Sequence, residues 1–354
     1  MYEQFTERHL MSSGQPPSVN EGASQPEGAI GSARPASLSS GSHGFARPPT
    51  ILPRSAVRLD RRIAAVVTLL PALGTLAAIA LWIGGHGPGA VEWIVFALFY
   101  FATALGLEVG FHRHVTHKAF KAKPWVRTAL IALGSMGAHG PVNWWASTHR
   151  RHHSTSDGDG DPHSPHLSGE GFGGRLRGLY HSHMGWLFVG ESTRPAGWEK
   201  YVPDLYQDPL VFRQHMAYYR WVAIGLALPP LVCGLASRSW TGVLLGFLWG
   251  DMARIFAVSH CIWALNSLCH VIGRRDFHTT AHDRSRNSLL LAIPTFGQGW
   301  HNNHHAFPAS AFTGLHWWQI DPGGLLVRVL ERLHLVYDVH RPNAELIEKK
   351  RIAP

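Results

Sequence analysis

The sequence predicts an all-α integral membrane protein with four transmembrane helices and a helical cap gathered on one side of the membrane. The 354-residue chain has a mean hydropathy of -0.05, which hides a separation into polar segments and four long apolar runs. Basic residues lie beside the ends of these runs, and three short histidine clusters lie at or beyond the ends. The runs predict the spans, and the clusters predict the cap.

The first 55 residues are predicted to be disordered. They are rich in Ser, Gly, Pro and Ala and contain few large apolar side chains, so they cannot bury a core. They also lack the short apolar run behind basic residues that is typical of a signal peptide. We therefore place a membrane domain at 56–345, followed by a short basic tail at 346–354.

Each apolar run is long enough to cross a bilayer, whose hydrocarbon core of about 30 Å needs about 20 helical residues. The predicted spans, arranged as two hairpins, are residues 63–83, 90–111, 217–236 and 242–265. The fourth span carries Asp251, Arg254 and His260. Because charges in a span are costly unless they face a polar interior, the alternative for this segment is a buried helix of a soluble core.

The basic residues predict the orientation. Four of them precede the first span: Arg54, Arg58, Arg61 and Arg62. The turn at 84–89 contains no Lys or Arg, so the positive-inside rule places the N-terminus in the cytoplasm. With four spans, the loop 112–216 and the segment from 266 onward lie on the same side. We expect a multi-pass protein of the cell (inner) membrane with its N-terminus, histidine clusters and C-terminus in the cytoplasm.

Charge and cysteine content argue against two other classes of protein. The formal charge of +9 is spread over the predicted cytoplasmic face instead of forming one stripe, so we predict no nucleic-acid partner. Anionic lipid or an acidic electron-transfer protein could use this surface. Cys233, Cys261 and Cys269 lie in or beside apolar spans without CxxC spacing, which predicts packing residues and no disulfide or zinc knuckle.

Eight histidines form three boxes, HRHVTH, HRRHH and HNNHH. They are His112 and His117; His149, His152 and His153; and His301, His304 and His305. Imidazole is a good ligand for divalent iron, so this grouping predicts a metal site. One ion seldom takes more than six ligands, and eight rings therefore indicate two metals.

The spacing of the boxes predicts how the rings are presented. Residues three and four apart share a helix face, so we expect each HxxHH box to point its three rings at one point. His112 and His117 are five residues apart, about 140° on a regular helix. The first box should therefore approach the site from a helix end or a distorted turn.

Four further segments complete the predicted cap. The apolar stretch 124–146, interrupted by Gly and Pro, predicts a helix at the membrane interface. The Gly/Asp loop 154–178 either positions ligands or substrate or is an ordinary solvated loop. Residues 286–299 are apolar but too short to span, and they lead into the third box. Residues 323–340 alternate apolar and charged side chains at helical spacing, which predicts an amphipathic helix on the domain or on lipid.

The order, spacing and flanks of the boxes resemble the membrane fatty-acid desaturases, specifically the acyl-CoA delta-9 (stearoyl-CoA-like) branch in a bacterial form. The resemblance covers about residues 60–340 and is carried by HRHVTHKAFKAKP, WWASTHRRHHSTSDGDGDPHSP, WALNSLCH and RNSLLLAIPTFGQGWHNNHHAFP. It implies a four-span fold whose cytoplasmic cap holds a non-haem centre of two Fe²⁺ ions. There, oxygen is activated to remove two hydrogens from a saturated acyl chain.

The resemblance also implies the residues of the site. The implied iron ligands are His112, His117, His149, His152, His153, His270, His301, His304 and His305. Asn266 matches a position that holds a water molecule near one iron, and Trp145, His139 and Ile262 match positions along a bent acyl tunnel. Neutral ligands without a bridging carboxylate suit the activation of oxygen at two positively charged irons.

The implied reaction places a cis double bond at carbon 9 of a C16 or C18 chain. Ser147 and Thr148 stand where vertebrate members have an Arg-Asp pair associated with coenzyme A, so acyl-CoA, acyl-lipid and carrier-protein esters all stay open as substrates. The chain has no haem-binding HPGG motif, flavin fingerprint or CxxC cluster. Electrons are therefore expected from a separate ferredoxin-type or cytochrome-type protein with its own reductase.

Two other readings compete with desaturation. A di-iron membrane hydroxylase or alkane monooxygenase shares the boxes, but the WxxNSxxH segment (residues 263–270) and the DPH loop (residues 161–163) favour desaturation. A membrane metal transporter would carry its ligands near the bilayer midplane on the spans. The histidine boxes instead lie at span ends or in predicted cytoplasmic segments.

Overall fold

The computed structural model describes residues 54–189, 197 and 199–353. The segment predicted to be disordered lies outside the described residues, except for its last two positions, which begin the first long helix. Among the described residues, strands occur in one short antiparallel pair, β1 (Lys121–Ala122) with β2 (Val336–Tyr337). The predicted all-α class is confirmed.

Four helical runs are long and apolar enough to cross a membrane: Val57–Ile83, Ala90–Thr116, Tyr218–Ser237 and Trp240–His270. They are built from α2 (Arg54–Ile83), α3 (Ala90–Leu105), η1 (Gly106–Thr116), α10 (Tyr218–Ser237), α11 (Trp240–Leu245), η3 (Gly246–Ala253), α12 (Arg254–Ser267) and η4 (Leu268–His270). The four predicted spans are confirmed as long apolar helices. The first begins six residues before its predicted start, the second and fourth continue five residues past their predicted ends, and the third is shifted by one residue. Apolar composition marks the lipid-embedded part of a helix but not the turns that project beyond it.

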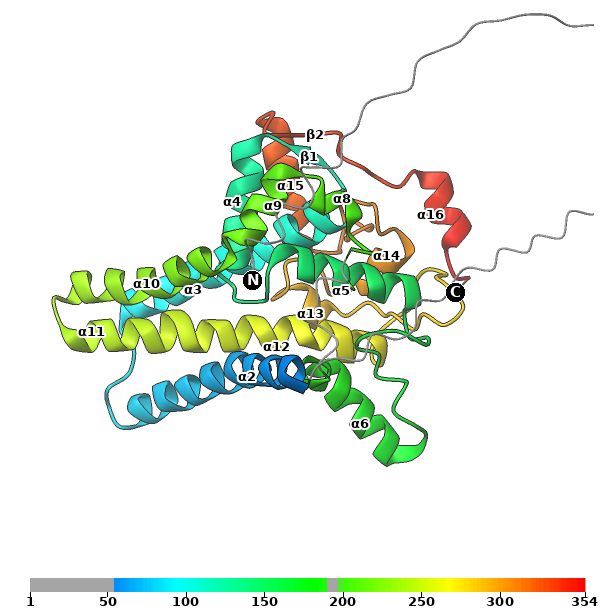
Figure 1. Ribbon diagram of the computed structural model, residues 1–354. Coiled ribbons are helices and arrows are strands. Elements are labelled where there is room, and N and C mark those ends of the chain that lie inside the picture. Colours follow the sequence, from blue (N-terminus) through cyan, green and yellow to red (C-terminus); the bar gives the residue numbers. More distant parts are fainter. Residues whose placement is uncertain (1–53, 190–196, 198, 354) are drawn as a thin grey trace, which may run out of the picture. The chain divides into compact units, whose positions relative to one another are not determined.

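The spans form the two predicted hairpins. The turns from α2 to α3 and from α10 to α11 lie at one end of the long helices, and α5 (Val142–Thr155), α14 (His301–Ala306) and α16 (Ala344–Lys350) lie toward the other (Figure 1). The turn after α10 is made by Arg238 in the left-handed conformation, with φ 50°. The helices that carry the second and third histidine boxes therefore lie at the same end of the spans.

Close backbone packing fixes the first box against the cap. The segment η1 runs beside α4 (Pro124–Ser135), and a Cβ atom added at Gly106 would lie 2.2 Å from the backbone nitrogen of Gly134. A Cβ at Gly110 would lie 2.6 Å from the carbonyl oxygen of Leu130. Only glycine permits so close an approach. These glycines hold the end of the second span at a fixed distance from the cap.

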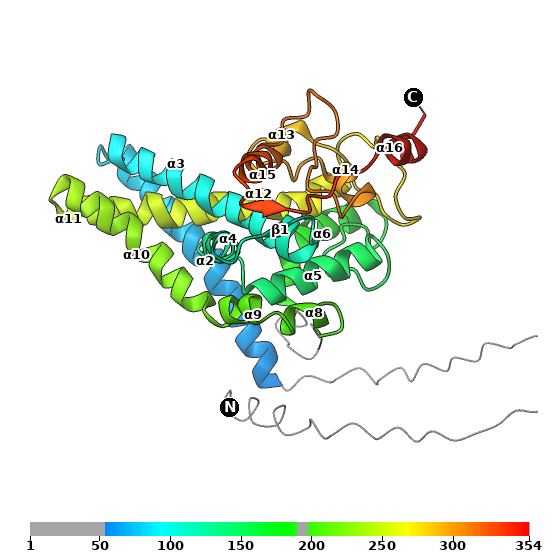
Figure 2. The ribbon, with the colours of Figure 1, turned by 90° about the horizontal axis from the view of Figure 1, so that it is seen from above.

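The remaining cap elements are α6 (Gly171–His183), η2 (Gly185–Phe188), α8 (Pro203–Tyr206), α9 (Pro209–Met216), α13 (Leu289–Ala292) and α15 (Pro322–Arg332). Helices α5 and α14 lie near each other in both views of the ribbon (Figures 1 and 2), and their histidine side chains touch. The face between these two helices is where the candidate site lies.

Three cap predictions need correction. The predicted helix 124–146 is broken at 136–141, where Gly140 has φ 89°. Part of the predicted loop 154–178 is helical, because α6 begins at Gly171. The helix predicted over 323–340 ends at Arg332, because the chain turns through a left-handed residue at 334 and enters β2. In each case a backbone turn that side-chain periodicity does not reveal sets the boundary.

Candidate metal centre

The first box lies on a π-helical segment. Residues Gly106–Thr116 form η1, and the backbone N–H of His117 donates to the carbonyl of His112 at 3.1 Å. Because a π-helix closes its hydrogen bonds between residues five apart, these two side chains emerge on the same side. Their ring centroids are 4.9 Å apart. The predicted distorted turn is confirmed, and it explains how a five-residue spacing can serve one site.

The nine predicted ligand histidines come together in two neighbouring groups. Cluster A consists of His112, His117, His149 and His304, and cluster B consists of His152, His270, His301 and His305. Within each cluster the candidate ligand atoms lie within 4.8 Å of one another. The ninth histidine, His153, lies between them: its Nε2 is 3.0 Å from Nε2 of His149 and 2.8 Å from Nε2 of His304, and its ring stacks on His305 at 4.3 Å.

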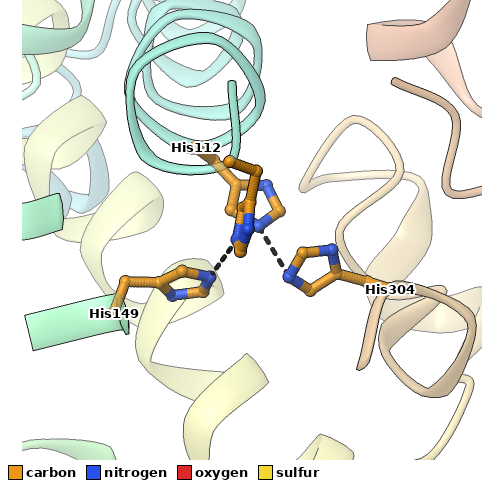
Figure 3. Close-up of side chains that lie close together, drawn as sticks. His112, His149 and His304 are labelled. Atoms are coloured by element: carbon orange, nitrogen blue, oxygen red, sulfur yellow. Dashed lines mark hydrogen bonds between the residues drawn. The ribbon is translucent and has the colours of Figure 1, made fainter. Parts of the chain in front are cut away.

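The expectation that each HxxHH box points its rings at one place is wrong. Helix α5 contributes His149 to cluster A and His152 to cluster B, and α14 likewise contributes His304 to A and His301 to B. Residues three or four apart share a helix face but diverge across it, so one helix reaches two adjacent sites. In Figure 3, His112, His149 and His304 approach one another from three separate elements.

The spacing of the ring nitrogens fits metal coordination. The Nε2 atoms of His112 and His304 are 3.0 Å apart, and those of His270 and His301 are also 3.0 Å apart. Two imidazoles bound at right angles to one ion, each at about 2.1 Å, have nitrogens about 3.0 Å apart. In cluster B, the Nε2 atoms of His152 and His305 are buried, and neither has a hydrogen-bond partner among the described residues. The donor set therefore fits a divalent metal in each cluster.

Electrostatics favour the metal-binding form of these rings. Burial, followed by repulsion from neighbouring histidines, lowers the pKa of most of them well below 6.5; they are His117, His149, His153, His301, His304 and His305. At neutral pH these imidazoles are uncharged and each keeps a lone pair. A metal ligand must be deprotonated in this way, so burial prepares the site for a cation.

Four of the rings are held by buried carboxylates through their other nitrogen. The Nδ1 partners are Glu108 for His112 (2.7 Å), Asp161 for His152 (3.0 Å), Asp157 for His270 (2.6 Å) and Asp283 for His305 (2.6 Å). When Nδ1–H donates to a carboxylate, the ring orientation is fixed and Nε2 becomes the free ligand atom. Burial alone would raise the pKa of Asp157, but hydrogen bonds from His270 and Ser164 lower it, which keeps this carboxylate ionised.

The sequence predicted these carboxylates only in part. Asp157 and Asp161 lie in the Gly/Asp loop, whose ligand-positioning alternative is thereby supported, and Asp159 between them is exposed. The only available signal was the concentration of three aspartates in DGDGD just after the second box, and this pattern does not reveal that the outer two are buried and the central one is not. Glu108 was missed although it stands one helical turn before His112. Asp283 lies in an irregular segment whose local pattern gives no indication of its role.

A buried arginine supports the carboxylate beside His112. The Arg113 guanidinium donates to Glu108 at 2.6 Å, to Asp321 at 2.7 Å and to Thr313 at 3.1 Å. Asp321 also accepts from the backbone N–H of Gly324 at 2.8 Å and so caps α15. This network neutralises the buried charge on Glu108 and ties the first box to the start of α15.

The predicted substrate residues lie beside cluster A and along α12. Trp145 is 8% exposed and stacks on His149, with ring centroids 4.9 Å apart. Ile262 belongs to the same buried apolar cluster as Trp145. The Nε2 atom of His139 is 3.2 Å from the Ser259 hydroxyl, and burial beside Arg254 lowers the pKa of His139 to about 4. The predicted water-holding residue, Asn266, lies in the last turn of α12.

Histidines outside the predicted ligand set brace the loop around cluster B. The ring of His163 lies 4.5 Å from that of His152, and Nε2 of His166 is 3.0 Å from the carbonyl oxygen of His270. The Nε2 atom of His181 is 3.2 Å from the carbonyl oxygen of Pro162. These contacts keep the DPH loop against the metal-facing rings.

These features define a class of protein: a multi-pass membrane protein whose cap buries two adjacent polyhistidine sites of the kind that bind metal. Comparison with known proteins narrows the class. Residues 91–338 match the family described as fatty acid desaturase, and the chain belongs to this family. The family resemblance inferred from the boxes is confirmed at that level.

The names of three relatives refer to acyl chains on three different carriers: acyl-carrier protein, lipid and coenzyme A. The chain is 43% identical over 287 residues to a hex-5-enoyl-[acyl-carrier protein] acetylenase of Moorena producens, covering 80% of this chain and 88% of that protein. It is 34% identical over 276 residues to an sn-1 stearoyl-lipid 9-desaturase of Anabaena variabilis, covering 78% and 92%. It is 32% identical over 262 residues to an acyl-CoA C20 Delta5-desaturase of Anemone leveillei, covering 74% and 77%.

Proposed function

We propose that this protein is an oxygen-dependent fatty-acyl desaturase that introduces a cis double bond at carbon 9 of a saturated C16 or C18 chain. The observation that carries the proposal is the pair of neighbouring four-histidine clusters at the cap end of four long apolar helices. Such a site is suited to a two-electron oxidation of a lipid chain that reaches it from the membrane. The match to the desaturase family supports the same reaction class.

The nine clustered histidines would hold two Fe²⁺ ions, four in each cluster with His153 between them, and Asn266 would hold a water molecule near one of the ions. When bound, the irons would supply the activation of dioxygen and the removal of two hydrogens from the acyl chain. The protein's own contribution is to present neutral rings in fixed orientations. The buried carboxylates Glu108, Asp157, Asp161 and Asp283 do this by accepting hydrogen bonds from the Nδ1–H groups of the rings.

The position of the double bond depends on how the chain is held beside the metal-facing rings. We propose that Trp145, His139 and Ile262 line the bent acyl path. Trp145 supports this role because it is buried and touches both His149 and His112, which places its indole between the apolar core and cluster A. A rigid indole there would fix one methylene pair at the reacting position, since small displacements of a bound group cost large factors in rate.

For the carrier we propose coenzyme A, with membrane lipid and acyl-carrier protein as the alternatives that direct assay separates. We propose further that the cap, the N-terminus and the C-terminus face the cytoplasm of the inner membrane, since four arginines lie within the first nine residues of α2, at its cap end, and none lies in the 84–89 turn. Electrons would come from a separate ferredoxin-type or cytochrome-type protein with its reductase.

Expression in a host that makes no unsaturated fatty acids tests the proposal. Lipids extracted from the cells are analysed by mass spectrometry with chemical localisation of double bonds. We expect cis-9 monounsaturated C16 and C18 chains, absent from cells that express a His304→Ala variant. A hydroxylated chain would instead assign the protein to the hydroxylase branch, and a triple bond would assign it to acetylene formation. Purified protein supplied with acyl-CoA, acyl-lipid or acyl-carrier protein then identifies the carrier.

A further inference from the structure

A cationic groove lies behind the helix that carries the third histidine box. It has a volume of about 410 Å³, and its lining includes Arg274, Arg275, Arg351, Asp276, His316 and Trp318. Arg274 pairs with Asp276 at 3.3 Å and Arg351 pairs with Glu348 at 2.9 Å, so three arginines meet two carboxylates there and the groove keeps a net positive charge. The Arg274 side chain is 80% exposed, and Arg351 is also exposed. The opening is therefore available to a large anionic partner.

Both sides of the groove are anchored on two adjacent asparagines of HNNHH. On one side, the Asn302 side chain accepts from the backbone N–H groups of Asp276 and Phe277, both at 2.8 Å. On the other, the Asn303 side chain donates to the side chain of Gln319 at 2.8 Å. Asn302 and Asn303 are buried, and they lie between His301 and His304 in α14. The groove therefore lies directly behind the helix that carries three of the metal-facing rings.

An aromatic contact leads from the groove toward the same helix. The ring of Trp318, which is 42% exposed, lies 5.4 Å from the ring of buried Trp300 in an edge-to-face arrangement. Trp300 immediately precedes His301. Exposed Trp317 stands next to Trp318. Arginine and tryptophan are the residues most enriched among the energetically dominant positions of protein interfaces. Their combination here is typical of a surface that binds another protein.

We propose that this groove is the docking site of a small acidic one-electron carrier protein that reduces the metal centre. The inference rests on the proposed desaturase function. For each double bond, dioxygen accepts the two hydrogens of the chain together with two electrons and two protons, and it leaves as two water molecules. Two reduced carriers supply the electrons, one each, and are oxidised. A carrier must bind close to the buried clusters because electron transfer slows steeply with distance.

Charge makes an acidic carrier the occupant that fits. Opposite charges steer a protein partner to its site and raise the association rate, whereas like charges repel it. The lining of the groove contains none of the residues proposed for the acyl path, Trp145, His139 and Ile262. A small anion such as coenzyme A is the competing occupant, and the experiment includes it.

The test uses the full-length iron-loaded protein in nanodiscs of uncharged lipid, with an acidic [2Fe–2S] ferredoxin as the probe. Reversing two exposed charges, in the double variant Arg274→Glu/Arg351→Glu, should raise the KM for reduced ferredoxin by about tenfold or more with little change in kcat at saturation. The binding constant measured by surface plasmon resonance should weaken in parallel. The matched control is Arg175→Glu, which reverses an exposed arginine on α6 and should leave both values unchanged.

Two further arms separate this inference from the proposed function. When the protein is reduced by dithionite without oxygen, freed of excess dithionite and then exposed to dioxygen, the double variant should form as much product in a single turnover as wild type does. If wild type forms no product even with dithionite, the desaturase proposal fails, and ferredoxin binding alone then decides the docking site. The docking site is overturned if the double variant binds ferredoxin as tightly as wild type does, or if Arg175→Glu weakens ferredoxin binding equally. It is also overturned if the double variant loses binding of coenzyme A while its KM for ferredoxin stays at the wild-type value.

Discussion

Removing the carboxylate behind His270 should weaken metal binding without touching a predicted ligand. Asp157 accepts from Nδ1 of His270 at 2.6 Å, from the Ser164 hydroxyl at 2.7 Å and from the backbone N–H of Arg284 at 2.9 Å. Asp157→Asn keeps the shape and one acceptor oxygen but removes the negative charge. Asp157→Ala removes the charge and all three hydrogen bonds.

The expected size of the effect follows from these contacts. A buried hydrogen bond to a charged group contributes about 1.5–3 kcal/mol. A factor of ten in affinity corresponds to about 1.4 kcal/mol. Asp157→Asn should therefore weaken metal binding at cluster B about tenfold, and Asp157→Ala about a hundredfold, which is the usual range for residues that orient metal ligands. Asp159→Asn is the matched control, because Asp159 lies in the same loop and is exposed.

The assay is competition with a graded series of ferrous chelators, followed by iron determination by plasma mass spectrometry. Wild type and Asp159→Asn should release iron at the same chelator strength, and the Asp157 variants should release it earlier, in the order Ala before Asn. If Asp157→Ala resists chelators as well as wild type, or if Asp159→Asn loses iron as easily as Asp157→Asn does, the carboxylate does not hold the metal-facing ring.

Three other predictions use the same site. His152→Ala and His304→Ala, one in each cluster, should each retain less than about a tenth of wild-type desaturation while inserting normally into the membrane. Higher activity in either variant would argue against the ligand assignment. A loss of activity in the exposed control His340→Ala would also argue against it. Trp145→Ala should slow turnover and broaden double-bond position more than it lowers iron content; parallel loss of iron and activity would show that its stacking on His149 supports the metal site instead of the chain. The iron-free protein should lose stability as the pH falls below about 6.5. Burial lowers the pKa of the clustered histidines in the folded protein, so the unfolded chain binds more protons at such a pH. A thermal unfolding midpoint that is equal at about pH 7.5 and about pH 5.5 would contradict this linkage.

Sequence patterns were sufficient where a feature depends on composition or on a local spacing. The spans follow from apolar runs, because a helix that crosses the hydrocarbon core of a bilayer needs about 20 consecutive residues that are predominantly apolar. Eight of the ligand histidines follow from their boxes, and His270 follows only from the resemblance of the WALNSLCH segment to the desaturase family. The five-residue spacing of His112 and His117 even predicted a distorted helix, which the structure shows as the π-helical segment η1.

What the sequence did not reveal depends on contacts between distant segments. Asp283 meets His305 only because the chain between α12 and α13 folds back over α14. Arg113 binds Asp321 across a separation of 208 residues. The division of each HxxHH box between two clusters depends on where the opposing rings stand, so His301 and His304 of one helix face different partners. No local pattern carries that information.

The most direct test of the account is the number of irons held by each chain. Protein purified in detergent after iron supply should contain close to two irons per chain, and single substitutions in cluster A or cluster B, His304→Ala or His301→Ala, should each lower the count to about one or less. Plasma mass spectrometry with quantitative amino-acid analysis gives the ratio. A reproducible value of one iron in the unaltered protein, or full desaturase activity with zinc in place of iron, would contradict the two-iron centre.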